Sequence, residues 1–280
     1  MAKRAGGGRK SGAPRAVSRA AKERAAKERA DVALVSRGLA DSRAKAAALI
    51  MAGSVFSGEK RVEKAGEGVA PGQPLRVRGP EHPYVGRGGL KLAGGLDHFS
   101  LSPEGLICLD VGASTGGFTD VLLQRGAVRV YAVDVGYGQL AQKLRDDARV
   151  DVMARTNARH LSAEDVPEPV GAIVCDASFI GLRTVLPAPL ALAAPGCWLV
   201  ALIKPQFEVG PERVGKGGIV RDEAARAAAC QTIQDWLASL PGWTVLGLTR
   251  SPVTGADGNV EYLIAARLKG DEDGEGAADV

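Results

Sequence analysis

The stretch that decides the fold is Leu109-Asp110-Val111-Gly112-Ala113-Ser114-Thr115-Gly116-Gly117-Phe118-Thr119-Asp120. The apolar run that ends at Leu109 predicts a buried parallel strand, and the amphipathic run that follows predicts a helix closed by Gly126. Glycines between them allow the backbone to turn tightly and to approach a ligand closely. Because the helix would present its first N–H groups to the crevice at the strand's carboxyl end, the stretch predicts a ligand site in a doubly wound sheet.

The order of residues in this turn differs from the dinucleotide fingerprint. G-x-G-x-x-G places pyrophosphate on a helix, whereas D-x-G-x-S-x-G-G puts an acid at the strand end and favours a cationic ligand such as S-adenosylmethionine. A second acid on the next strand would bind its ribose, and Asp134 follows Asp110 by 24 residues, near the expected interval. The alternative is an ordinary strand-turn-helix without a ligand. The cofactor residues predicted here are Asp110, Gly112, Ser114, Gly116, Gly117, Phe118 and Asp134.

Length and composition narrow the class of protein. A chain of 280 residues holds one large domain or two smaller ones plus tails. No apolar run is long enough to span a bilayer, and the N-terminus lacks the apolar core of a secretory signal. The four cysteines show no C-x-x-C spacing, and three lie in apolar runs, so we expect buried thiols in a cytoplasmic protein. With no cluster of His and Cys, we expect no metal site.

Charge is strongly segregated along the chain. The net charge is +4, yet residues 1–30 carry +8 and residues 270–280 carry −5. We expect a disordered basic arm at 1–29 and a disordered acidic tail at 269–280. A basic arm suits nucleic-acid binding through phosphate neutralisation, and a merely solvated tail is the alternative.

The first predicted domain spans residues 30–79. Helices are expected at 31–37 and 43–52, and short strands at 55–56 and 74–78. Leu34 to Arg43, then Ala46, Leu49-Ile50, Gly53-Ser54-Val55 and the run from Gly72 to Val77 resemble the S4 RNA-binding domain. The resemblance implies that two helices and their basic face bind structured RNA. A small helical adaptor is the alternative. The RNA-binding candidates are Arg37, Arg43, Lys45, Lys60 and Arg61.

A linker at 80–85 precedes the second predicted domain, 86–268, where strands and helices alternate. A helix is expected to run towards Phe99, and further helices at 117–125, 139–145, 181–193 and 222–239. Strands are expected at 106–109, 129–134, 150–153, 171–175, 197–203, 243–249 and 260–266. Alternation predicts a mostly parallel α/β sheet with helices on both faces, Rossmann-like as in class I methyltransferases. Since no helix separates the last two strands, we expect an antiparallel closing pair. The N-terminal domain that resembles S4 is expected to be a small α+β domain.

Charged residues stand at the ends of several of these strands. Asp176 and Lys204 each follow an apolar strand, Glu261 lies near the start of the last one, and Lys91 lies in the first turn of a helix. Carboxyl ends of parallel strands open on one crevice, so we expect the four to converge. A lysine destabilised as an ammonium by burial and by a second lysine can take the proton of an attacking ribose 2′-hydroxyl. Each residue alone also has a structural explanation. Asp176 could cap a helix, Lys204 could be a loop charge, and Glu261 could form a surface ion pair.

Seven segments together resemble the TlyA, or haemolysin A, family of ribosomal RNA 2′-O-methyltransferases, which join an S4 domain to an FtsJ-like methyltransferase domain. They are Gly86 to Leu92, Leu109 to Thr119, Val133 to Leu140, Arg155 to Arg159, Asp176 to Ile180, Lys204 to Gly210 and Gly258 to Tyr262. The resemblance implies Lys91, Asp176, Lys204 and Glu261 as the catalytic tetrad.

The resemblance also implies cytidine in ribosomal RNA as the target, on the large subunit alone or on both subunits. Asn157 is then expected to meet the adenine of the cofactor, with Asp176 also on the cofactor, and the loop 209–221 to lie over the site. Arg87, Arg213 and Lys216 join the RNA-binding candidates. We expect a monomer bound to ribosomal subunits. The alternatives are a non-catalytic S4-type ribosome-binding protein and a membrane-active haemolysin.

Overall fold

The computed structural model describes residues 27–51, 53–78, 82–255 and 258–270. They form two compact units, with the division between Glu81 and His82. The predicted basic arm up to residue 26 and the acidic tail from residue 271 lie outside the described residues. The arm was expected to be disordered up to residue 29, which is wrong at its end, because Glu28–Arg29 form a strand that pairs with Gly68–Val69. No helix in the described ranges combines the length and the apolarity that crossing a membrane requires.

The first unit is a small α+β domain. Its elements are β1 (Glu28–Arg29), α1 (Ala30–Ser36), α2 (Arg43–Met51), β2 (Val55–Ser57), β3 (Lys60–Arg61), β4 (Gly68–Val69) and β5 (Arg76–Val77). The strands β3-β2-β5 form one antiparallel sheet, and β1 pairs with β4. Leu34, Ile50 and Val55 are buried at the centre of its core. Gly38 and Gly53 follow the two helices with positive φ, as expected of residues that end helices.

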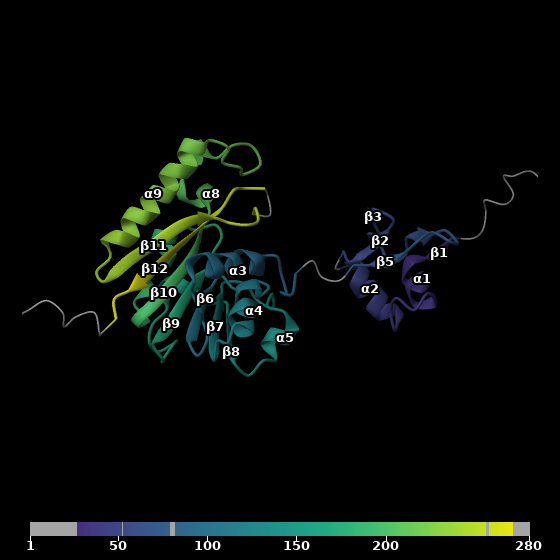
Figure 1. Cartoon of the computed structure of the whole chain (residues 1–280), viewed down its shortest axis with the longest axis horizontal. Helices are drawn as coiled ribbons and strands as arrows, with labels where there is room; N and C mark the ends of the chain where they lie inside the picture. The colour runs from purple at the N-terminus through teal and green to yellow at the C-terminus, as the bar shows by residue number, and fades with distance from the viewer. Residues whose placement is uncertain (1–26, 52, 79–81, 256–257, 271–280) are drawn as a thin grey trace, which may run out of the picture. The chain divides into compact units, whose positions relative to one another are not determined.

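The second unit is a seven-stranded sheet between helices (Figure 1). Its strands are β6 (Ile107–Val111), β7 (Arg129–Asp134), β8 (Val150–Ala154), β9 (Val170–Cys175), β10 (Ala193–Ile203), β11 (Trp243–Arg250) and β12 (Tyr262–Leu268). Their order is β11-β12-β10-β9-β6-β7-β8, and β12 runs antiparallel to both of its neighbours. The predicted sheet, parallel except for an antiparallel closing pair, is therefore confirmed.

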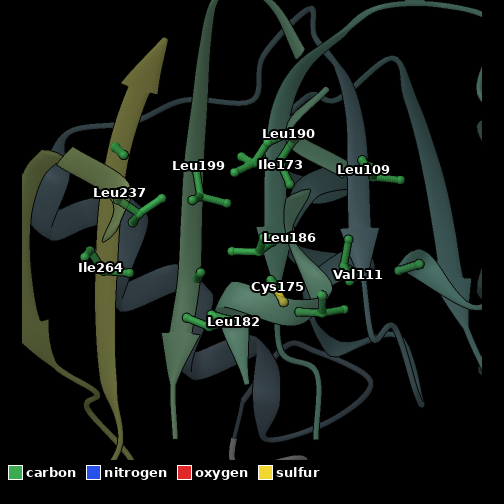
Figure 2. Close-up of a cluster of buried hydrophobic side chains, with 14 of the residues drawn as sticks. Leu109, Val111, Ile173, Cys175, Leu182, Leu186, Leu190, Leu199, Leu237 and Ile264 are labelled. Carbon is green, nitrogen blue, oxygen red and sulfur yellow. The ribbon is translucent and has the colours of Figure 1, made fainter. Parts of the chain in front are cut away.

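Helices cover both faces of this sheet. They are α3 (Gly88–Phe99), α4 (Gly117–Gln124), α5 (Gln142–Arg145), α6 (Leu182–Val185), α7 (Pro187–Leu190), α8 (Pro205–Glu208) and α9 (Glu223–Ser239), with 3₁₀ turns η2 (Ala158–His160) and η3 (Pro211–Arg213). One apolar cluster joins one face of the sheet to α3, α4 and α5, and another joins the opposite face to α6, α7 and α9. Figure 2 shows the second cluster, where Leu109, Ile173 and Leu199 of neighbouring strands meet Leu186 and Leu237. Successive strand residues point to opposite faces, which is why these strands are apolar throughout.

Several predicted boundaries are wrong in detail. The helix expected at 139–145 begins only at Gln142, and the helix expected at 181–193 is two short helices, because Pro187 and Pro189 lack the N–H groups that would continue it. Part of the expected linker packs on the second unit: the Val85 N–H donates to Asp120 Oδ2 over 2.8 Å. All four cysteines are buried and free, as predicted.

Candidate active site

Four ionisable side chains from four separate elements meet at the carboxyl ends of β9 and β10. Lys91 comes from the first turn of α3, Asp176 and Lys204 directly follow β9 and β10, and Glu261 directly precedes β12. Lys204 Nζ lies 2.7 Å from Asp176 Oδ1, and Lys91 Nζ lies 3.9 Å from Asp176 Oδ2 and 2.7 Å from Glu261 Oε2. The structure thus brings together the four residues, hereafter the tetrad, while their catalytic role stays a prediction.

The tetrad is buried and alternates in charge. Lys91, Lys204 and Glu261 are 9%, 7% and 3% exposed, and the side chain of Asp176 is 20% exposed. Removing such charges from water costs several kcal/mol for each ion unless close opposite charges offset it. A fold that buries two lysines and two carboxylates at the mouth of a cavity is therefore more typical of a functional site than of a structural ion pair.

Lys204 has three acceptors around its ammonium. Besides its ion pair with Asp176 Oδ1, its Nζ donates hydrogen bonds to the backbone oxygen of Asp176 over 3.1 Å and to Ser178 Oγ over 2.7 Å. Ser178 was not among the predicted site residues. Its signal in the sequence was its position two residues after Asp176, the acid that directly follows β9.

Two cavities, each of about 420 Å³, meet beside the tetrad. One, the tetrad cavity, is lined by all four tetrad residues, and the other, the Asp134 cavity, by Asp134 and Asn157. Both cavities share the lining residues Gly112, Ser114, Asp176, Ser178 and Phe179. A two-part ligand or two reactants could therefore occupy adjoining spaces and meet at Asp176 and Ser178.

The Asp134 cavity suits an adenosine. The carboxylate of Asp134 is held by two backbone groups, since the N–H of Ser114 donates to Oδ2 over 2.8 Å and that of Gly136 to Oδ1 over 2.6 Å. A carboxylate has about four acceptor positions, so capacity remains for two ribose hydroxyls. Asn157 offers an amide and Ile180 an apolar wall in the same cavity. These residues fit the adenosine part of S-adenosylmethionine, and their role in binding it stays a prediction.

Asp110 does not lie where the sequence placed it. It is fully buried and lines neither cavity. Its Oδ2 accepts a hydrogen bond from Thr119 Oγ1 over 2.6 Å, and its Oδ1 has no partner within the described residues. Burial raises the pKa of Asp110 to about 7, although the Thr119 hydrogen bond opposes the rise. Asp110 was expected to contact the cofactor. It lies outside both cavities instead, and its hydrogen bond to Thr119 joins the end of β6 to α4.

The glycines of the turn are required mainly by the protein's own packing. Gly112 has φ +85°, and a Cβ there would lie 2.9 Å from the backbone N of Ala177. A Cβ on Gly117 would lie 2.9 Å from the backbone N of Gly89, at the start of α3. The equivalent space at Gly116 is filled by the side chain of Leu144, and Gly116 lines neither cavity. Close approach to a ligand was therefore the wrong reason for Gly116. Gly112 lines both cavities, whereas Phe118, predicted as a cofactor residue, lines only the tetrad cavity.

Phe179 is an exposed aromatic at the junction of the two cavities. It is 90% exposed, lines both cavities, and its ring centroid lies 5.2 Å from that of Phe207. Its φ of 65° is strained for a bulky residue, and such strain is concentrated at functional sites. Phe179 was not among the predicted site residues, because backbone strain and exposure are not visible in residue types.

The predicted RNA-binding residues of the second unit separate into two groups. Arg87 lines the tetrad cavity. Arg213 and Lys216 are exposed on the loop 209–221, and among the described residues neither cavity is lined by any part of that loop. The loop is instead tied to the tetrad through Asn259, whose side chain accepts from the Val220 N–H over 3.1 Å and donates to the Gly218 oxygen over 2.9 Å, two positions before Glu261.

The predicted RNA-binding residues of the first unit are all exposed, as a basic contact face requires. Two of them also take part in local ion pairs, Arg43 with Asp31 at 2.9 Å and Lys60 with Glu67 at 3.1 Å. The Lys60–Glu67 pair is on the surface and contributes little to stability, so it leaves Lys60 available. Asp31 is buried, so Arg43 also helps Arg29 to neutralise a buried carboxylate. The five exposed residues are Arg37, Arg43, Lys45, Lys60 and Arg61.

Comparisons with known proteins agree with both units. Residues 84–268 match the FtsJ-like methyltransferase family, and residues 28–75 match the S4 domain. The 16S/23S rRNA (cytidine-2′-O)-methyltransferase TlyA of Mycobacterium tuberculosis is 47% identical over 86% of this chain and 90% of that protein. Hemolysin A of Brachyspira hyodysenteriae is 39% identical over 81% of this chain and 95% of that protein. A solved structure from Streptococcus thermophilus, provisionally named a hemolysin, has a TM-score of 0.67 and 42% identity, covering 87% of this chain and 89% of that one.

Proposed function

Since the chain belongs to the FtsJ-like methyltransferase family and carries an S4 domain, we propose that it methylates the 2′-hydroxyl of a cytidine in ribosomal RNA. S-adenosylmethionine is the proposed methyl donor, and ribosomal subunits in the cytoplasm are the proposed partner. The observation that carries the proposal is the buried tetrad at the junction of two cavities. Cytidine as the proposed target follows from the activity that the name of the M. tuberculosis relative states.

In this proposal the Asp134 cavity binds the cofactor. Asp134 accepts hydrogen bonds from the ribose hydroxyls, and Asn157 meets the adenine edge. The bound cofactor supplies a methyl group on a sulfonium. Asp176 and Ser178 line both cavities, so the methyl group and the target hydroxyl would meet beside them. All four tetrad residues come from one chain, so a monomer suffices.

Lys204 is the proposed general base. Its role is to take the proton of the 2′-hydroxyl as that oxygen attacks the methyl carbon, which is worth about 10²–10⁴ in rate. Asp176 orients it at 2.7 Å, and Lys91 contributes a second positive charge on the far side of Asp176. Lys91 itself is paired at 2.7 Å with the buried Glu261, which favours a fixed electrostatic role for Lys91.

RNA recognition is divided between the two units. Phe179, almost fully exposed at the cavity junction, offers a ring on which a splayed-out base can stack. Arg87 in the tetrad cavity is placed to contact a phosphate. The basic face of the first unit supplies affinity for structured RNA, and phosphate contacts make that affinity depend strongly on salt.

Nucleoside analysis tests the proposal. Ribosomal subunits that lack the modification are incubated with the protein and methyl-labelled S-adenosylmethionine, and the RNA is digested and analysed by mass spectrometry. We expect labelled 2′-O-methylcytidine with the natural protein and none with Lys204→Ala, which serves as the matched control. Subunit binding without any transfer would instead support the non-catalytic alternative, and label on a base would contradict ribose methylation.

A further inference from the structure

The hydroxyl of Ser178 lies between the buried Lys204 and the open space of both cavities. Its Oγ is 2.7 Å from Lys204 Nζ, and the residue is exposed, whereas Lys204 is only 7% exposed. Ser178 lines both the tetrad cavity and the Asp134 cavity. A substrate hydroxyl that enters the junction therefore reaches Ser178 more easily than it reaches the amine behind it.

Ser178 differs from the other partners of Lys204 in its capacity to donate as well as to accept a hydrogen bond. An ammonium has three N–H donors and no acceptor. The three nearest acceptors of Lys204 are the backbone oxygen of Asp176, Asp176 Oδ1 and Ser178 Oγ. The ammonium donates hydrogen bonds to the backbone oxygen and to Ser178 Oγ, whereas Asp176 Oδ1 is an ion-pair partner without an aligned hydrogen bond. In the described part of the chain, the Ser178 hydroxyl donates to no other group.

The partners that Lys204 needs are different when its amine is neutral. The amine then has two N–H donors and one lone pair, and the lone pair needs a donor. A carbonyl oxygen and an ionised carboxylate can only accept, whereas a hydroxyl both accepts and donates. Ser178 is therefore the one partner of the three that can satisfy both protonation states of Lys204, by reversing the direction of a single hydrogen bond.

We propose that Ser178 is a catalytic residue that relays the proton of the target 2′-hydroxyl to Lys204. The inference rests on the proposed function. As the 2′-oxygen forms its bond to the methyl carbon, the electrons of the carbon–sulfur bond return to sulfur and neutralise the sulfonium. The 2′-hydroxyl proton passes to Ser178 Oγ, and the proton of Ser178 passes to Lys204 Nζ. Serine ends as a hydroxyl and Lys204 as an ammonium, so the step is balanced.

The loop that carries Ser178 is fixed at both ends, as a relay requires. The Asp176 N–H donates to the Val111 oxygen over 3.0 Å, and the Leu182 N–H donates to Glu208 Oε1 over 2.8 Å. Between them, Ala177 packs on Gly112 so closely that a Cβ on the glycine would lie 2.9 Å away. A relay group must be held within a fraction of an ångström of its partners, and these contacts supply that constraint.

The charged groups that face the relay are the tetrad itself. Asp176 lies against Lys204, and Lys91 and Glu261 follow on the far side of Asp176. Because Ser178 carries no net charge, replacing it leaves this charge pattern intact. A Ser178 variant thus separates proton transfer from electrostatic stabilisation.

The test is single-turnover methyl transfer to saturating ribosomal subunits by the full-length protein, for natural Ser178, Ser178→Ala and Ser178→Thr. We expect Ser178→Ala to slow transfer by about 10²-fold, the lower end of the range for a positioned proton-transfer group. Ser178→Thr keeps the hydroxyl and should recover most of the rate. Cofactor affinity, measured by calorimetry, should be the same for all three.

The rate is also measured in mixtures of H₂O and D₂O. With a relay, two protons move together and the rate of the natural protein falls along a curve as D₂O increases, whereas the Ser178→Ala rate falls on a straight line. A Ser178→Ala rate within twofold of natural would overturn the inference alone. A slow Ser178→Ala variant with an unchanged curve would also overturn it, because Ser178 would then only orient Lys204. A natural protein that transfers nothing to ribose would overturn the proposed function first.

Discussion

A methyl group added at Gly112 tests how the glycine turn at 112–117 packs against the loop that follows β9, which carries Asp176 and Ala177. Gly112 has φ +85°, and a Cβ would lie 2.9 Å from both the N and the Cα of Ala177. Gly196 has a similar φ of +79°, but nothing lies within 4 Å of its Cβ position. The two residues are in the same unit, so Gly196→Ala is a matched control for the conformational cost alone.

The two variants should lose different amounts of unfolding free energy, because only a Cβ at Gly112 meets other backbone atoms. A left-handed backbone costs a non-glycine residue about 1–2 kcal/mol, and alanine recovers about 0.4–1 kcal/mol by restricting the unfolded chain, so Gly196→Ala should cost about 1 kcal/mol. Gly112→Ala adds overpacking against backbone that cannot rotate away, about 1–3 kcal/mol. We therefore expect a loss of about 2–4 kcal/mol of unfolding free energy for Gly112→Ala.

Urea unfolding followed by tryptophan fluorescence measures this difference. Trp198, Trp236 and Trp243 are the chain's three tryptophans and all lie in the second unit, so the signal reports that unit alone. Gly112→Ala should also weaken S-adenosylmethionine binding under conditions where it is folded, because Ala177 must move. Equal losses for the two variants, within about 0.5 kcal/mol, would refute the claim that the turn and the loop are packed backbone to backbone.

Three further outcomes are expected. Asp134→Ala should weaken S-adenosylmethionine binding more than tenfold, since each hydrogen bond to a charged group contributes about 1.5–3 kcal/mol; unchanged affinity in calorimetry would remove Asp134 from the site. Burial raises the pKa of Asp110 from 3.8 to about 7, so its contribution to stability is complete below about pH 4 and is lost as the pH rises through 7. The free energy of unfolding of the natural protein, measured in urea, should therefore fall by up to about 1.4 kcal/mol per pH unit across this window relative to that of Asp110→Asn. If the two proteins show the same dependence of unfolding free energy on pH, the carboxyl of Asp110 is not buried and protonated. Deleting residues 1–81 should abolish salt-sensitive binding to ribosomal subunits while calorimetry still detects cofactor binding; full subunit affinity of the second unit alone would contradict an RNA-binding role for the S4 domain.

The fold could be predicted because its signals are local and repeated. Apolar runs such as the one ending at Leu109 alternate with amphipathic helices, and the missing helix between β11 and β12 predicted the antiparallel pair. The convergence of Lys91, Asp176, Lys204 and Glu261 followed from topology, since strand ends in such a sheet open on one crevice. Boundaries failed where the chain breaks a helix internally, as at Pro187.

The rest of the site depends on tertiary contacts that cannot be predicted from the residue types. Asp110 was expected on the wall of the cofactor cavity, but its full burial follows from packing against α4. Gly116 was assigned to a ligand, whereas Leu144 occupies the space. Ser178 and Phe179 looked like ordinary residues after a strand, and only their distances and exposure indicate a role.

Mapping of ribose methylation in cells tests the central claim most directly. Ribosomal RNA is compared by mass spectrometry between cells that have the protein, cells that lack it, and cells that carry only Lys204→Ala. We predict one or more 2′-O-methylcytidines that are present with the natural protein and absent from the other two. Identical methylation maps in all three would contradict the account, and methylation that persists with Lys204→Ala would remove Lys204 as the base.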